Sequence, residues 1–160
     1  MSDVLLTYGW VRSSYSALRN FKKHGLQVVV SDSSSIGMSQ FSRFSSEFKK
    51  YTSHYEDENK FISDILNICS SKEIKLILPS HNETEIIARH RHKFPDDLVA
   101  IIPDESHCRM FNNKSDAYDY VSNIDVPVPC RIKYADPNLV SQLLKNKGVE
   151  KTVIKLLTGN

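Results

Sequence analysis

Two lysines that lie far apart in the sequence occupy positions where a cation is unusual. Lys114, in the stretch NNKSD, falls at the first position of a predicted helix that Asn113 can cap. There its charge faces the positive end of the helix dipole, which costs about 0.3 to 1 kcal/mol unless an anion lies close by or the side chain bends into water. Lys155, in TVIKLL, shares one face of a predicted strand with Val153 and Leu157. It either reaches solvent as the gatekeeper of an edge strand or meets an anion.

Polar residues also follow the first predicted strand, at residues 4–7, on the edge where parallel sheets bind ligands. Arg12, Ser13 and Ser14 could hold a small anion at the N-terminus of the next helix. A serine cap followed by a surface arginine explains them equally well. Gly9 is the only glycine of a G-x-G-x-x-G pattern that is present, and bulky residues follow it. A nicotinamide dinucleotide is therefore disfavoured.

A second polar stretch, SHNE at residues 80–83, follows the predicted strand at residues 74–78. Carboxyl ends of parallel strands share one edge, so Asn82 and Glu83 would face the same crevice as the first loop and could bind a substrate. A helix cap explains these two residues nearly as well. Asp32 ends the second strand, and without the glycine pattern we expect it to form a turn rather than to bind a ribose.

Metal binding and thiol chemistry find little support. His90 and His92 are two residues apart, so on a helix they point to different sides, and no further ligands complete a set with His81. We therefore expect no metal site within this chain. Cys108 has no histidine nearby and is predicted to fill apolar space. The three cysteines of the chain form no C-x-x-C pattern, which fits a reducing compartment.

The composition is that of an ordinary soluble protein. Among 160 residues, 40% are hydrophobic and 25% charged, and the formal net charge is +2. Since acidic and basic residues are spread along the chain, we expect neither nucleic acid nor a membrane surface as a partner. The first residues, MSDVLLTYGW, are unlike a signal peptide, and no apolar stretch approaches the length expected of a membrane span. These features predict a cytoplasmic protein, and a homo-oligomer is compatible with them.

The order of predicted elements indicates an α/β fold. Short apolar runs alternate with amphipathic helices, which predicts a Rossmann-like, mainly parallel sheet with helices on both faces. The serine-rich segment at residues 31–50 is expected to be a long loop anchored by its apolar residues, which are Ile36, Met38, Phe41, Phe44 and Phe48. The expected strands are 4–7, 26–31, 74–78 and 98–102, and the expected helices begin near Ser13, Glu58, Asn82 and Lys114.

A domain boundary is predicted at the two prolines of VPVPC, because prolines force extended backbone. Residues 1–126 then form the Rossmann-like domain. Residues 127–160 form a partial α+β subdomain, with strands at 131–134 and 152–157 and a helix that begins at Pro137.

Three stretches resemble the ATP-grasp enzymes, most closely their carbamoyl-phosphate synthase large-subunit-like branch: LILPSHNETEIIARHRHKFP, NNKSDAYDYVSNIDVPVP and TVIKLLTGN. The resemblance implies that Lys114 and Lys155 contact ATP phosphates and that Gly159 begins a glycine-rich loop that closes over them. It further implies that ATP lies between two α+β subdomains, with Mg²⁺ held by side chains outside this chain.

The function expected from this resemblance is that of the N-terminal portion of an ATP-dependent carboxylate–amine ligase, which works through an acylphosphate. The 160-residue chain would not be catalytic alone, and its sequence identifies neither catalytic residues nor the carboxylate and the amine. The alternative is a stand-alone Rossmann-like module that binds a small anion or a partner along the Gly9–Ser14 and Ser80–Glu83 edge. A nicotinamide-dependent oxidoreductase is a third hypothesis, weakened by the incomplete glycine pattern.

Overall fold

The structure, a computed structural model, describes residues 2–100, 102–129, 131 and 137–146. The chain separates into two compact units, Met1–Cys108 and Arg109–Asn160. The predicted division into residues 1–126 and 127–160 concerns domains rather than these packing units, and it stays a prediction. Within the described part of the chain, no helix has the length and apolar character needed to cross a bilayer.

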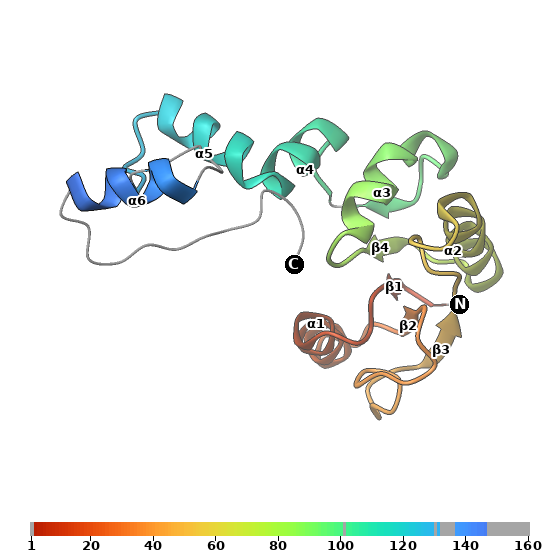
Figure 1. Ribbon diagram of the computed structural model, residues 1–160. Coiled ribbons are helices and arrows are strands. Elements are labelled where there is room, and N and C mark those ends of the chain that lie inside the picture. Colours follow the sequence, from red (N-terminus) through yellow and green to blue (C-terminus); the bar gives the residue numbers. More distant parts are fainter. Residues whose placement is uncertain (1, 101, 130, 132–136, 147–160) are drawn as a thin grey trace. The chain divides into compact units, whose positions relative to one another are not determined.

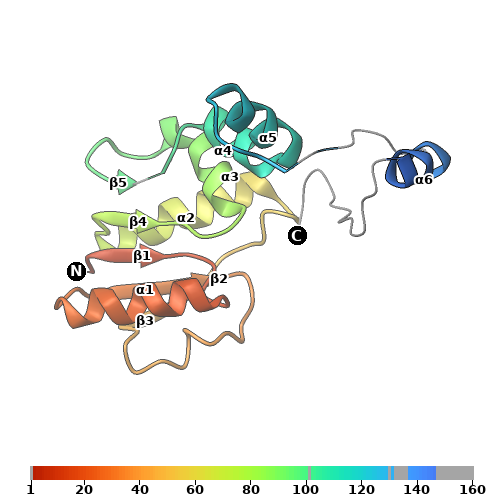
Figure 2. The ribbon, with the colours of Figure 1, turned by 90° about the vertical axis from the view of Figure 1, so that its left-hand side faces the viewer.

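The first unit is built on a sheet of five parallel strands in the order β3-β2-β1-β4-β5 (Figures 1 and 2). In the centre of the sheet, Leu5 pairs with Val29 on one side and with Ile77 on the other. This arrangement confirms the predicted Rossmann-like parallel sheet. The strands are β1 (Val4–Leu6), β2 (Val28–Asp32), β3 (Glu47–Lys50), β4 (Leu76–Leu78) and β5 (Val99–Ala100).

Helices cover both faces of this sheet, as Figures 1 and 2 show. Neighbouring residues of a strand point to opposite faces. Leu5 therefore packs with Phe61 of α2 and Ile87 of α3, whereas Leu6 packs with Leu18 of α1 on the other side. Each side chain is fully buried, which stabilises the fold by about 1.5–3 kcal/mol apiece. The helices of this unit are α1 (Arg12–Lys23), α2 (Glu58–Lys72), α3 (Glu83–Arg89), the 3₁₀ turn η1 (Arg91–Lys93) and the start of α4 (Glu105–Asn112).

The serine-rich segment differs from its prediction because it contains the edge strand β3. Its polar sequence, EFKK, has the half-exposed character of an edge strand and not the apolar run of the central strands. Phe44 and Phe48 pack against the core as expected. Ile36 and Phe41 are 67% and 75% exposed, and Met38 is also exposed, so their prediction as anchors is wrong.

Some helices end where the sequence predicts, and others do not. Gly25 ends α1 with a φ of +83°, as its place after the basic last turn predicts. The helix expected to reach Phe94 ends at Arg89 and continues as the 3₁₀ turn. The predicted serine cap of α1 is wrong, because the helix begins at Arg12 and Val11 occupies the cap position without a side-chain hydrogen bond.

In the second unit, α5 (Lys114–Asn123) begins as predicted. The Asn113 side chain accepts from the backbone N–H groups of Ser115 and Asp116. Helix α6 (Pro137–Asn146) starts at the expected proline. Apart from Arg131, the strands expected at 131–134 and 152–157 lie outside the described residues.

The segment that follows the two prolines is attached to α5. The Arg131 guanidinium lies 4.1 Å from the centre of the Tyr118 ring and pairs with the Asp119 carboxylate. The Tyr118 hydroxyl in turn donates to the carbonyl oxygen of Pro129 at 2.7 Å. These contacts hold the start of the predicted subdomain against the helix that carries Lys114.

Candidate functional site

The carboxyl edge of the sheet brings together loops that follow β1, β2, β3 and β4. Tyr8 after β1 and His81 after β4 both have positive φ angles, +51° and +61°. Residues other than glycine rarely adopt this left-handed conformation. Where they do, the strained residues are found preferentially at functional sites. The two rings stack with centroids 5.0 Å apart. The loops that follow the neighbouring strands β1 and β4 are therefore joined at this edge.

Ser14 is one of the predicted binding residues, and the structure places it beneath this edge. Its buried hydroxyl donates to the carbonyl oxygen of Tyr8 at 2.8 Å and lies 3.1 Å from the hydroxyl of Ser80. Ser14 thus braces α1 against both loops. Arg12 and Ser13, by contrast, are exposed at the start of α1. Their contact with an anion, like that of Ser14 with a substrate, stays a prediction.

Gly9 is required by close packing. A Cβ atom at this position would lie 2.6 Å from Cγ1 of Val30, far inside van der Waals contact. Its backbone N–H donates to the carbonyl oxygen of Ser31 at 3.1 Å. The packing of the β1 loop on β2 therefore explains this glycine.

Asp32 forms the turn that the sequence predicts. One carboxylate oxygen accepts from the backbone N–H of Trp10 at 2.8 Å, and the other accepts from that of Ser34 at 2.9 Å. The side chain is buried. It therefore holds the loops after β1 and β2 together, which confirms its structural role.

Glu83, another predicted binding residue, lies at the first position of α3 and is only 1% exposed. One carboxyl oxygen accepts from the Tyr51 hydroxyl, which itself accepts from the backbone N–H of Tyr8 at 3.1 Å. The other oxygen, Oε2, accepts no hydrogen bond within the described part of the chain. Through these hydrogen bonds, Tyr51 and Glu83 join the start of α3 to the ends of β1 and β3.

The pKa of Glu83 is raised to about 7, chiefly because the carboxyl is buried. Hydrogen bonds from the hydroxyls of Thr7 and Tyr51 lower the pKa in part, and the nearby charge of Asp32 raises it further. Burial and the Glu83 charge also raise the pKa of Tyr51 above its ordinary value. The sequence indicated Glu83 but missed Tyr51, which directly follows the unpredicted edge strand. Asn82 precedes α3 without capping it, and its side-chain amide donates to the hydroxyl of Tyr55 at 2.9 Å.

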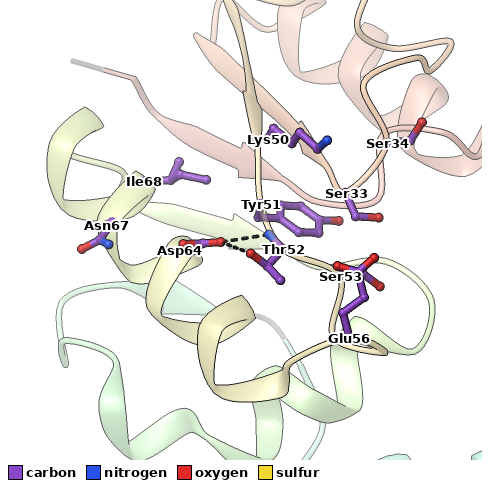
Figure 3. A pocket seen from close by; sticks show the side chains of 10 residues that line it. All are labelled: Ser33, Ser34, Lys50, Tyr51, Thr52, Ser53, Glu56, Asp64, Asn67 and Ile68. Atoms are coloured by element: carbon purple, nitrogen blue, oxygen red, sulfur yellow. Dashed lines mark hydrogen bonds between the residues drawn. The ribbon is translucent and has the colours of Figure 1, made fainter.

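A groove of about 740 Å³ opens beside this network, between the loop after β2, the segment after β3 and α2 (Figure 3). Its wall is built by Asp64, which accepts from the backbone N–H and hydroxyl of Thr52 at 2.9 and 2.8 Å. Sequence reasoning missed the groove because it treated this segment as a plain loop. The groove is lined by Ser33, Ser34, Lys50, Tyr51, Thr52, Ser53, Glu56, Asp64, Asn67 and Ile68.

Of the three residues predicted to bind the nucleotide, the structure describes Lys114 alone. Lys114 is the first residue of α5, as expected. Lys155 and Gly159 lie outside the described residues, so the proximity of the two lysines stays a prediction. In the part of the chain that the structure describes, no three His, Cys, Asp or Glu side chains gather as metal ligands.

Solved structures of biotin carboxylase domains share this fold. One belongs to a single-chain bacterial carboxylase, with a TM-score of 0.61, 16% identity, and coverage of 92% of this chain and 35% of that one. Another is the domain of the Hydrogenobacter thermophilus 2-oxoglutarate carboxylase in complex with MgADP, ADP and bicarbonate, with a TM-score of 0.59, 15% identity and coverage of 91% and 33%. The urea carboxylase of Kluyveromyces lactis matches with a TM-score of 0.56, 14% identity and coverage of 80% and 12%.

The chain thus spans about a third or less of these proteins. At such identities the likeness establishes the fold. No protein-family model and no curated protein was found to match the sequence.

Proposed function

We propose that this chain supplies the Rossmann-like domain, and the beginning of the nucleotide-binding domain, of an ATP-dependent carboxylate–amine ligase of the ATP-grasp type. The observation that carries the proposal is the fold match over 91–92% of the chain to two biotin carboxylase domains, one of them in complex with MgADP and bicarbonate. The resemblance of its three sequence stretches to the carbamoyl-phosphate synthase-like branch supports the finer assignment.

One described residue supports a site for a nucleoside triphosphate. Lys114 stands at the first position of α5, where a bound phosphate would meet both its ammonium group and the positive end of the helix dipole. Asn113 already satisfies the N–H groups of Ser115 and Asp116. We therefore assign phosphate binding to the lysine side chain, with Lys155 and the loop at Gly159 as its proposed partners.

The chemistry proposed for the whole protein consists of two transfers. A carboxylate oxygen attacks the γ-phosphorus of ATP, ADP leaves, and an acylphosphate forms. An amine nitrogen then attacks the acyl carbon, and inorganic phosphate leaves. The lysines of this chain would hold the phosphates in line and neutralise their charge during the first step. Mg²⁺, held outside this chain, would supply further positive charge. By itself the 160-residue chain would not catalyse the reaction.

Titration calorimetry of the full-length protein with MgATP tests this proposal. We expect replacement of Lys114 or Lys155 by methionine to weaken MgATP binding by about tenfold or more, since each change removes a charge-assisted contact. Replacement of Lys23, at the end of α1 in the first unit, should have no effect. Release of ADP over many turnovers should depend on both a carboxylate and an amine, because the amine must consume each acylphosphate before the next can form. A full-length protein that binds no MgATP, or two lysine variants that bind it unchanged, would contradict the proposal.

The cytoplasm is the proposed location, because ATP is available there. The free thiols of Cys69 and Cys108 fit a reducing compartment.

A further inference from the structure

The groove beside β3 contains two kinds of polar group: those that already bind other groups of the protein, and those that do not. Asp64 belongs to the first kind. Burial acts to raise its pKa, but hydrogen bonds from Thr52 and the nearby Lys60 ammonium hold the pKa below its usual value. Tyr51, on the floor, is held between the Glu83 carboxyl and the N–H of Tyr8. These groups build a fixed wall and floor.

The second kind consists of side chains that bind no other described group of the protein. Within the described residues, Lys50 and Glu56 form no ion pair, and the side chains of Ser33 and Asn67 make no hydrogen bond. Figure 3 shows Lys50 and Glu56 on either side of Ser33. Counting only the part of the chain that the structure describes, the groove therefore offers one cation and one anion without an ion-pair partner, together with the Ser33 hydroxyl.

We propose that this groove binds a small zwitterion of the α-amino acid class. Its carboxylate would accept from the Lys50 ammonium and the Ser33 hydroxyl, and its ammonium group would donate to the Glu56 carboxylate. Such a ligand satisfies both unpaired charges at once, whereas a simple anion would leave Glu56 unpaired and add a like charge beside it. A volume of about 740 Å³ leaves room for the side chain of the ligand.

The position of the groove supports ligand binding. It lies at the carboxyl ends of β2 and β3, the edge at which open parallel sheets hold their ligands. Every lining residue belongs to the first unit. The proposal is thus independent of the nucleotide-binding function, which depends on Lys114 and Lys155.

Nuclear magnetic resonance of the ¹⁵N-labelled 160-residue chain, titrated with each of the common L-amino acids, tests the proposal. We expect at least one to give saturable shifts confined to the groove, at residues such as Ser33 and Ser53. The deaminated acid and the decarboxylated amine of the best binder should each bind about tenfold more weakly or worse, because each lacks one charged contact.

Variants identify the residues responsible. Lys50→Met and Glu56→Gln should each weaken binding by about tenfold or more. The matched changes Lys49→Met and Asp97→Asn, at surface ion pairs outside the groove, should leave it unchanged. Both groove residues are exposed, so circular dichroism should show native folding for each variant.

Several outcomes would overturn the proposal. They are the absence of groove shifts with every amino acid, equal binding of the deaminated acid or of a neutral polyol, and binding that the two groove variants leave intact. An MgATP titration of the full-length protein carrying Lys50→Met separates the two sites. Loss of amino acid binding with unchanged nucleotide binding is the expected result, and loss of both would overturn the independence of the groove.

Discussion

The buried carboxyl of Glu83 makes the stability of this protein depend on pH in a direction opposite to that of most carboxylates. Its pKa is raised from 4.5 to about 7 in the folded chain, chiefly by burial. In the unfolded chain the group returns to its ordinary value. Between these two pKa values the folded protein holds a proton that the unfolded protein has lost, so folding takes up a proton.

The sign and size follow from this difference. Since the folded state binds more protons, the free energy of unfolding falls as pH rises through the window from 4.5 to about 7, and it levels off above that window. Each pKa unit corresponds to about 1.4 kcal/mol, so the loss is roughly 3 kcal/mol. That is a large fraction of the stability of a small domain.

Replacement of Glu83 by glutamine isolates this effect, because the amide resembles the protonated carboxyl and can still accept from Tyr51. Urea unfolding, followed by circular dichroism, should give the two proteins similar stability near pH 5, within about 1 kcal/mol. Near pH 8, the variant should be the more stable by roughly 3 kcal/mol. An exposed control, Glu73→Gln, should follow the wild type at both pH values.

Other titrating groups do not disturb the comparison. Burial lowers the pKa of His54, so its contribution to stability is lost as pH falls, which is the opposite trend. That contribution is common to the wild type and the Glu83→Gln variant and cancels in their difference. A difference that stays constant from about pH 5 to about pH 8 would refute the argument that burial keeps Glu83 neutral.

Three further changes test a close contact, a helix cap and a cluster of ion pairs. Gly9→Ala should destabilise the first unit by about 1–3 kcal/mol in urea unfolding, because its Cβ would lie 2.6 Å from Val30. Gly37→Ala, whose nearest neighbour would be 3.6 Å away, is the matched control and should change little. Asn113→Ala should weaken α5 by about 1 kcal/mol, seen as faster hydrogen exchange in its first turn, and unchanged exchange would contradict the cap. Arg89→Met should cost about 1 kcal/mol, since its three carboxylate partners are partly exposed, and added salt should reduce the difference from wild type.

The sequence predicted a residue's role correctly where its side chain accepts a hydrogen bond from a backbone N–H only two or three residues away. Asp32 ends strand β2 and accepts from the N–H two residues later, which is a local turn pattern. Asn113 caps a helix in the same local way. Ser14 has the residue type of a cap, but its hydroxyl is used by Tyr8 and Ser80, which lie on two different loops. Local patterns could not reveal that choice.

The sequence by itself determined the parallel sheet, because short apolar strands that alternate with amphipathic helices can be buried on both faces only in this arrangement. Only the tertiary structure decided that the polar segment Glu47–Lys50 forms the edge strand, that Tyr51 meets Glu83, and that Lys50 and Glu56 line one groove without an ion pair to any described residue. The reason is physical. The partners of these side chains come from distant segments, and which groups meet depends on strand register and loop packing, which no local pattern of residues encodes.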